Sequence, residues 1–204
     1  MPLRALSPPL PLQWAPRTDP PADLGLRYNL HRMIVLMAGL PGTGKTTLAR
    51  ELVQRTQGAL VSKDAIRAAL FSPDDIEYSV RQDDFVMEIM LEAARFLLQT
   101  APARNIFLDG RTFSRRYQID RVLAFARELA QPWAIIECAC SDESARQRLD
   151  LEPDPMHPAH NRTFALYAEV KARFEPIKCP KTAINTDQPI EQCIEQALVA
   201  VDAS

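Results

Sequence analysis

The stretch that decides the fold is Met33-Ile-Val-Leu-Met-Ala38, followed directly by Gly39-Leu-Pro-Gly-Thr-Gly-Lys-Thr46. The first six residues are all apolar, which is typical of a strand buried on both faces. The next eight match the phosphate-loop pattern G-x-x-x-x-G-K-[ST], and the following residues 45–57 have apolar side chains at helical spacing. Glycine permits the dihedrals that turn backbone amides toward a phosphate, and a helix N-terminus favours an anion. This order of strand, loop and helix predicts a nucleoside triphosphate site.

Individual residues of the loop have expected roles. Lys45 would reach the β- and γ-phosphates, and the Thr46 hydroxyl would ligate Mg²⁺. We therefore expect ATP and Mg²⁺ as cofactors. The residues expected to contact the nucleotide here are Gly39, Leu40, Pro41, Gly42, Thr43, Gly44, Lys45, Thr46 and Thr47. The alternative, a glycine-rich turn without a ligand, is disfavoured because the flanking strand and helix are those that the motif requires.

Length and composition fit a soluble globular protein. The chain has 204 residues, of which 47% are hydrophobic and 25% charged, and its net charge is −2. No apolar run approaches the ~20 residues of a transmembrane helix. The four cysteines lack the spacing of a zinc site or redox pair. We expect a cytoplasmic protein with no membrane partner, either a monomer or a weak homodimer.

The chain divides into two regions of different composition. Seven of the first 21 residues are proline, which predicts an extended, flexible tail over residues 1–31. From residue 32 to 204, strand and helix patterns alternate. This alternation predicts an α/β fold of the P-loop NTPase type, with a five-stranded parallel sheet covered by helices on both faces and a small lid. The expected strands are 33–38, 59–62, 105–109, 133–140 and 182–185.

Seven segments are expected to be helical. They span residues 45–57, 65–71, 80–99, 117–129, 143–151, 164–174 and 190–201. In the longest of them, the residues that recur at helical spacing are Phe85, Ile89, Ala93, Phe96 and Leu97.

The second strand leads into Val61-Ser-Lys-Asp64-Ala-Ile-Arg67. Strand ends in this architecture face the ligand crevice. Asp64 would start a short helix, and Arg67 would lie on the same helical face. A carboxylate beside the γ-phosphate can orient an acceptor hydroxyl and take its proton. The alternative is that Asp64 merely caps the helix and pairs with Arg67; position and chemistry together favour the functional interpretation.

The third strand closes in Ile106-Phe-Leu-Asp109. A hydrophobic run ending in aspartate is the form of a Walker B carboxylate, which helps to hold Mg²⁺, often through water. A cap on the following turn is the alternative. Three arginines, Arg111, Arg115 and Arg116, follow at the same edge, where they could hold an anionic acceptor or remain solvated.

These motifs together resemble the small phosphate-loop kinases related to polynucleotide 5′-hydroxyl kinase, zeta toxin and chloramphenicol phosphotransferase. The resemblance covers residues 33–201, and its carriers are GLPGTGKTT, VSKDAIR, IFLDGRTF, ARQRL, HPAHNRT and INTDQP. It implies that Asp64 is the general base and that Arg67 helps to position the acceptor. It also implies that the loop Thr186-Asp-Gln188 lies near the adenine.

A lid is expected over approximately residues 152–163. This segment is polar and proline-rich and lies between two expected helices, so it could close over the phosphates. The resemblance implies that Arg148 and Arg162 are the lid arginines. Relatives often carry another arginine where this chain has Glu152, which leaves the lid charge to Arg162.

The function predicted from these features is ATP-dependent transfer of the γ-phosphoryl group to a hydroxyl of a small molecule or a nucleic-acid end. The net charge of −2 favours a small molecule, because polynucleotide binding draws on cationic surface. Two alternatives remain open, a nucleoside or nucleotide kinase and an ATP-binding regulatory module without catalysis. A GTPase is disfavoured because the chain lacks an N-K-x-D motif.

Overall fold

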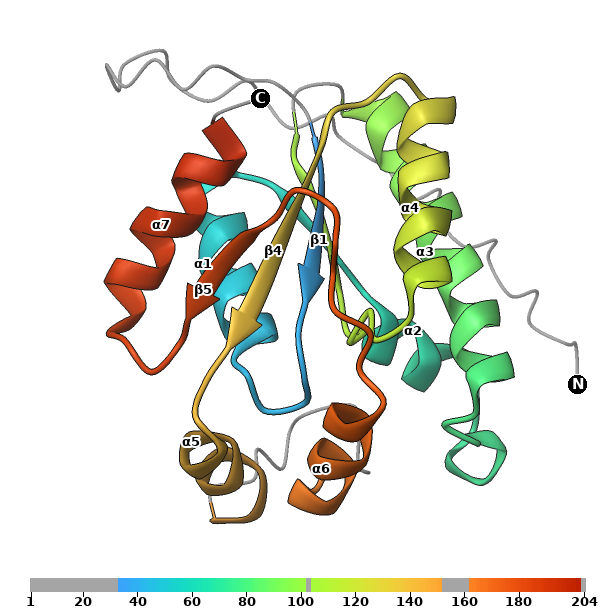
Figure 1. Ribbon diagram of the computed structural model, residues 1–204. Helices are drawn as coiled ribbons and strands as arrows, with labels where there is room; N and C mark the ends of the chain where they lie inside the picture. Colours follow the sequence, from blue (N-terminus) through green and yellow to red (C-terminus); the bar gives the residue numbers. More distant parts are fainter. Residues whose placement is uncertain (1–32, 102–103, 152–161, 203–204) are drawn as a thin grey trace, which may run out of the picture.

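Five parallel strands form a single sheet in the order β2-β3-β1-β4-β5 (Figure 1). The computed structural model describes residues 33–101, 104–151 and 162–202. The strands are β1 (Ile34–Ala38), β2 (Ala59–Ser62), β3 (Ile106–Asp109), β4 (Trp133–Ala139) and β5 (Thr182–Asn185). The predicted five-stranded parallel sheet is confirmed, and each strand lies within one residue of its expected bounds.

Helices connect the strands. They are α1 (Lys45–Thr56), α2 (Lys63–Leu70), α3 (Val80–Thr100), α4 (Arg116–Glu128), α5 (Asp142–Arg146), α6 (Phe164–Ala172) and α7 (Ile190–Asp202). A 3₁₀ turn, η1 (Pro73–Asp75), precedes α3, and a π-helical turn, η2 (Gln147–Leu151), continues α5. The single helix expected over 143–151 is therefore a short α-helix that widens into a π turn.

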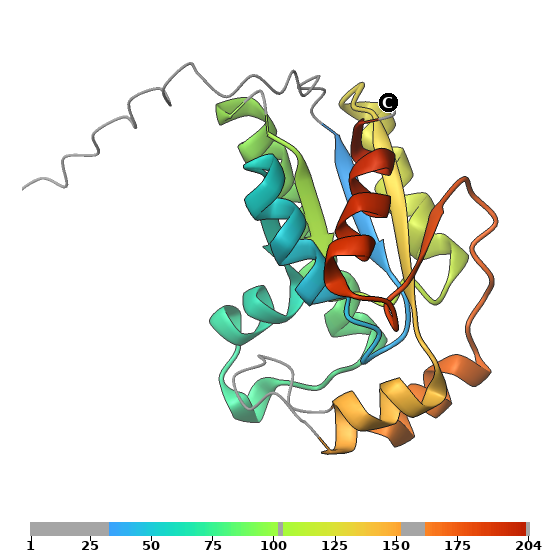
Figure 2. The same ribbon diagram turned by 90° about the vertical axis from the view of Figure 1, so that its left-hand side faces the viewer.

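Alternate residues of β1 enter two separate hydrophobic cores. Ile34, Leu36 and Ala38 belong to the core under α3 and α4, whereas Val35 and Met37 belong to the core under α1 and α7. Figures 1 and 2 show these two helix pairs on opposite faces of the sheet. Since both faces are covered, every residue of β1 is buried, which explains why the strand is uninterruptedly apolar.

The buried face of α3 differs from the set of residues noted in the sequence. Phe85 and Phe96 are exposed, and Ala93 and Leu97 are only partly buried. The apolar side chains of α3 that do enter the core are Val86, Met87, Met90, Leu91, Ala94 and Leu98. Both sets recur at helical spacing, because apolar residues occupy more than one side of this helix.

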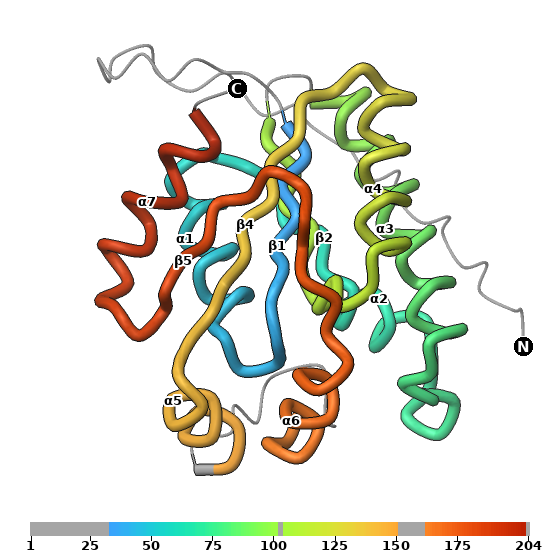
Figure 3. The backbone as a smooth tube through the Cα atoms, in the orientation of Figure 1, coloured from blue at the N-terminus to red at the C-terminus, as the bar shows by residue number. Residues whose placement is uncertain are grey.

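Two helices lie beyond the carboxyl ends of the strands. Figures 1 and 3 show α5 and α6 there, with the chain returning from α6 along the sheet before it enters β5. A small core joins them to the phosphate loop, since Leu149 and Tyr167 pack together and Leu40 packs against them. Asp142 of α5 also accepts hydrogen bonds from the Tyr167 hydroxyl at 2.6 Å and from Lys171 Nζ at 2.5 Å.

Parts of two sequence predictions fall outside the described residues. The expected tail over 1–31 is one, and residues 152–161 of the expected lid are the other. Within the described ranges, no helix combines the length and apolar character needed to cross a membrane. The end of the expected lid is described, and there the Thr163 hydroxyl caps α6 by accepting a hydrogen bond from the Leu166 amide at 3.2 Å.

Candidate active site

The loop between β1 and α1 has the backbone that an anion cradle requires. Gly39 has φ of 132°, and a Cβ placed there would lie 2.2 Å from the carbonyl oxygen of Cys138. Gly44, at the N-cap of α1, has φ of 78° and leaves the helix start without a side-chain cap. The first turn of α1 also contains no acidic residue. The positive end of the helix is therefore presented to the loop, where it favours a phosphate.

Lys45 is buried at the start of α1. Its Nζ donates a hydrogen bond to the Leu40 carbonyl oxygen at 2.6 Å, so the side chain folds back over the loop. Burial lowers the pKa of Lys45, and nearby Asp109 acts in the opposite direction. No carboxylate of the described residues forms an ion pair with Lys45. Its charge is therefore left for a phosphate.

Thr46 and Asp109, the two residues expected to hold Mg²⁺, are in contact. The Thr46 hydroxyl donates to Asp109 Oδ2 at 2.8 Å. Asp109 is buried at the end of β3, and its Oδ1 has no hydrogen-bond partner among the described residues. An orphaned carboxylate oxygen beside a hydroxyl fits Mg²⁺, which prefers oxygen ligands and keeps several waters.

A pocket of about 480 Å³ opens at the carboxyl edge of the sheet and joins many of the predicted residues. Those that line it are Pro41, Gly42, Gly44, Lys45, Thr46, Thr47, Asp64, Arg67, Arg148 and Arg162. The remaining predicted residues do not line it: Gly39, Leu40, Thr43, Asp109, Thr186 and Gln188. The loop that would hold phosphates and the carboxylate of Asp64 thus share one pocket.

Asp64 lies in the first turn of α2, but it does not cap that helix. The cap is Ser62, whose hydroxyl accepts a hydrogen bond from the Ala65 amide at 3.4 Å. The capping alternative for Asp64 is therefore wrong, because α2 starts at Lys63, two residues earlier than that alternative requires. The pairing alternative is right, since Arg67 Nη1 donates to Asp64 Oδ1 at 3.2 Å.

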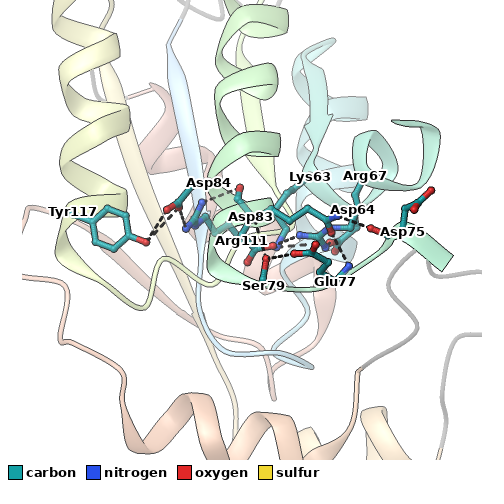
Figure 4. Close-up of polar contacts among 11 residues, drawn as sticks. Lys63, Asp64, Arg67, Asp75, Glu77, Ser79, Asp83, Asp84, Arg111 and Tyr117 are labelled. Atoms are coloured by element: carbon teal, nitrogen blue, oxygen red, sulfur yellow. Dashed lines mark hydrogen bonds and ion pairs between the residues drawn. The ribbon is translucent and has the colours of Figure 1, made fainter. Parts of the chain in front are cut away.

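The pair of Asp64 and Arg67 belongs to a larger ionic network that connects α2 with the start of α3 (Figure 4). Arg67 also contacts Asp83, and Lys63 Nζ donates to the same oxygen, Asp83 Oδ1, at 2.9 Å. Lys63 and Asp83 are not among the residues predicted from the sequence. Lys63 lies within the quoted segment VSKDAIR, where nothing sets it apart from an ordinary surface lysine. The signal for Asp83 is an acidic residue in a first turn capped by Ser79, which is equally typical of an ordinary helix start.

The three arginines after β3 have different environments. Arg111 is buried and donates to Asp84 Oδ1 at 2.5 Å and to the Asp83 carbonyl oxygen at 3.2 Å. Arg115 lines the pocket and pairs with Glu175 at 3.0 Å. Arg116 is 81% exposed, so it is the solvated member of the three.

Arg148 is held above the loop by neutral oxygens. It donates to the Thr186 hydroxyl at 3.1 Å, to the Thr186 carbonyl at 2.8 Å and to the Gly42 carbonyl at 3.4 Å. Thr186 in turn donates to the Thr43 carbonyl at 3.0 Å, which ties the start of the β5–α7 loop to the phosphate loop. Gln188 is exposed and accepts from Gln196 of α7 at 2.9 Å, so it lies outside the pocket.

Residues 34–177 match a protein-family model described as an AAA domain. Curated relatives include the adenylate kinase of Nautilia profundicola, which is 23% identical over 128 residues, covering 58% of this chain and 66% of the relative. The adenylate kinase of Thermococcus sibiricus is 27% identical over 136 residues, covering 59% and 67%. The alignments thus span about two thirds of the length of these relatives.

Solved structures of kinases share the fold. A sugar kinase from Janibacter sp. HTCC2649 has a TM-score of 0.61 at 21% identity, covering 84% of this chain and 95% of its own. The APS kinase of Mycobacterium tuberculosis, solved with AMPPNP and APS, has a TM-score of 0.63 at 14% identity, covering 84% and 98%. The chain therefore belongs to the AAA domain family and has the α/β phosphate-loop fold found in these kinases.

Proposed function

We propose that the protein is an ATP-dependent kinase that transfers the γ-phosphoryl group to a hydroxyl of a small molecule. The observation that carries the proposal is the continuity of the pocket from Lys45 and Thr46 to Asp64. A nucleotide on the loop would direct its terminal phosphate toward the part of the pocket that Asp64 lines. The shared pocket would bring phosphoryl donor and acceptor together, which is the main requirement of this reaction.

In the proposed reaction, the acceptor oxygen attacks the γ-phosphorus while the bond to the bridging oxygen of ADP breaks. Asp64 orients the acceptor hydroxyl and takes its proton. Lys45 and the loop amides hold the phosphates, and Arg148 and Arg162 stabilise charge on the transferring group. Mg²⁺, held by Thr46 and Asp109, would supply further positive charge at the phosphate oxygens when bound.

The resemblance to 5′-hydroxyl kinases, zeta toxin and chloramphenicol phosphotransferase supports a hydroxyl acceptor, because it includes the VSKDAIR segment that contains Asp64. A regulatory module that only binds ATP would not need a carboxylate in the same pocket as the phosphate loop. Binding without transfer to any acceptor would be the signature of such a module.

A nucleoside monophosphate kinase is a second candidate. Two observations favour it: the curated relatives are adenylate kinases, and several arginines line the pocket. In that reaction the acceptor is a phosphate oxygen, which is already ionised and needs no general base. The residue that separates the two candidates is therefore Asp64.

The product identifies the reaction. We would incubate the protein with Mg²⁺ and ATP in the presence of nucleosides, sugars, polyols, aminoglycosides, nucleoside monophosphates and 5′-hydroxyl oligonucleotides, and follow products by ³¹P NMR. The proposal expects a new phosphate monoester. Formation of nucleoside diphosphates alone would select the second candidate, and ATP binding without transfer to any acceptor would select the regulatory module.

A further inference from the structure

Six charged residues form a closed network on one side of the pocket, here called the acceptor wall. They are Lys63, Asp64, Arg67, Asp83, Asp84 and Arg111, so three positive charges face three negative ones (Figure 4). All but Asp84 line the pocket itself. The wall comes from three separate places in the chain, the start of α2, the start of α3 and the segment after β3.

Each cation of the wall is bound to a carboxylate. Arg67 pairs with Asp64 and Asp83, and Lys63 pairs with Asp83 at 2.9 Å. Arg111 pairs with Asp84 at 2.5 Å. Lys63 Nζ and the Nη atoms of Arg67 and Arg111 are therefore engaged, whereas Arg67 Nε and Arg111 Nε are buried without a hydrogen-bond partner among the described residues. The charges of the wall as a whole balance.

Burial separates the two signs of charge. The cationic side chains are the deeper ones, with exposed fractions of 9% for Lys63, 3% for Arg67 and 4% for Arg111. The carboxylates are more exposed, at 13% for Asp64 and 27% for Asp83. The carboxylates of the wall therefore expose a larger fraction of their side chains than the cations with which they pair.

This order of charge restricts the ligand. A phosphate or carboxylate of the acceptor would have to displace Asp64 or Asp83 from the cations that they already neutralise, which is unfavourable in a partly desolvated site. A cation gains little, because each carboxylate is already neutralised. Ionised carboxylates can only accept hydrogen bonds, so the matching ligand group is a donor without charge, and a hydroxyl meets this requirement.

Aromatic surface lies beside the wall. Tyr78 lines the pocket with φ of 50°, a left-handed conformation that is uncommon for a bulky residue. The Arg67 guanidinium lies over its ring, with Arg67 Cζ 5.1 Å from the ring centroid. Tyr117 also lines the pocket, and its hydroxyl lies 3.3 Å from Asp84. Aromatic faces suit the C–H surface of a ring-shaped or chain-like polyol.

We propose that the acceptor site takes an uncharged polyhydroxyl compound, with hydroxyls donating to Asp64 and Asp83, and discriminates against phosphorylated acceptors. This inference rests on the proposed function for its context. Five further arginines line the pocket. Arg115 pairs with Glu175 at 3.0 Å and Arg173 pairs with Glu169 at 2.9 Å. The other three, Arg50 of α1, Arg148 and Arg162, lie outside the wall, and the proposed reaction assigns Arg148 and Arg162 to the transferring phosphate.

Binding of matched pairs tests the inference. The protein, loaded with Mg²⁺ and a non-hydrolysable ATP analogue, would be titrated by ligand-observed NMR with ribose, glycerol, glucose and uridine and with the phosphate ester of each. We expect at least one neutral compound to bind, with its phosphate ester about tenfold weaker or worse. Equal or tighter binding of the esters, or no binding by any neutral compound, would overturn the inference.

Variants that remove a carboxylate of the wall should weaken its discrimination against phosphate esters. Asp83→Asn removes the carboxylate that pairs with Lys63 and Arg67. The ratio of the affinity for a neutral compound to the affinity for its phosphate ester should therefore fall about tenfold. Asp84→Asn, which exposes Arg111, serves if the first variant does not fold. Glu88→Gln is the matched control, because Glu88 lies one turn further along α3 and pairs with Arg121 outside the pocket. Unchanged preference in a folded wall variant would contradict the inference.

Phosphoryl transfer to the same compounds separates failure of the inference from failure of the proposed function. If neutral compounds bind and are never phosphorylated, the proposed selectivity of the wall stands and the proposed kinase activity is refuted. Phosphate esters that are accepted in preference to their neutral partners would keep the kinase and refute the selectivity of the wall.

Discussion

Lys45 holds a buried positive charge that no carboxylate of the described chain pairs with. Removal of this charge in Lys45→Ala should weaken binding of ATP–Mg²⁺ by about 10- to 100-fold, because a hydrogen bond to a charged group contributes ~1.5–3 kcal/mol. Isothermal titration calorimetry measures the affinity directly. Lys181→Ala is the control, since Lys181 pairs with Glu137 away from the pocket. Identical affinity of the wild type and Lys45→Ala would refute the role given to Lys45.

Asp109 offers a second test at a single residue. In Asp109→Asn, the amide oxygen can still accept the hydrogen bond from Thr46, while the negative charge for the metal is gone. We expect the Mg²⁺-dependent part of ATP affinity to fall strongly, with metal-free affinity nearly unchanged. Titrations with and without Mg²⁺ separate the two quantities. A variant with the full Mg²⁺ enhancement would show that Asp109 does not hold the metal.

Some residues of the site could be predicted from the sequence, and others could not, for a physical reason. Thr46 and Asp109 could be assigned to one metal ion in advance, because the phosphate loop that follows β1 and the end of β3 lie at the same edge of a parallel sheet. Lys63 and Asp83 could not, because their contact depends on how α2 packs against α3. Periodicity along a helix does not specify that packing.

At the scale of elements, α3 shows what an amphipathic pattern leaves undecided. Its length and position follow from the sequence, and the Ser79 cap agrees with its start. The side that is buried does not follow, because α3 has apolar residues on more than one side. Phe85 and Phe96 recur at helical spacing yet remain exposed, whereas Met90 and Leu91 fill the core. Tertiary packing decides between such stripes.

The contact between α5 and α6 should depend on pH. The Asp142 carboxylate accepts hydrogen bonds from Lys171 and from Tyr167. Both hold the pKa of Asp142 below its ordinary value of 3.8, and the bond from Lys171 has the larger effect. A lowered folded-state pKa gives stability that is present above pH 3.8 and is lost as the pH falls through the lower folded value.

Thermal unfolding of wild type and Asp142→Asn across acidic pH measures this effect. The wild type should be the more stable above pH 3.8, by a small margin because the pair is half-exposed, and the two proteins should converge at lower pH. A difference between wild type and Asp142→Asn that persists at the lowest pH would mean that the contact is not ionic.

For the whole molecule, the alternation of strand and helix patterns was enough to predict the parallel sheet with covered faces. The sheet order β2-β3-β1-β4-β5 was not predicted, because the pattern along the chain does not specify which strands are neighbours. The end of α5 at Arg146 and the π turn η2 that follows it were not predicted either, since a widened turn has no distinct sequence signal.

Residues 1–29 should be dispensable for the proposed chemistry. Every described residue that lines the pocket lies between Pro41 and Arg173. A chain that lacks Met1–Asn29 should therefore keep the affinity for the ATP analogue and the unfolding temperature of the full chain. Calorimetry and thermal unfolding compare the two. A well-folded truncation with much weaker nucleotide binding would show that the proline-rich segment completes the site.

The central claim is that Asp64 acts as the base of a hydroxyl kinase, and its most direct test is phosphoryl transfer by Asp64→Asn. The amide can still accept the hydrogen bond from Arg67, and Ser62 still caps α2, so the fold should persist. Asp120→Asn makes the same chemical change at an exposed site outside the pocket and should leave transfer unaltered. With the acceptor found by the screen, we predict unchanged ATP affinity and transfer slowed by roughly 10²–10⁴ in Asp64→Asn. Transfer within a few-fold of the wild-type rate would contradict the account.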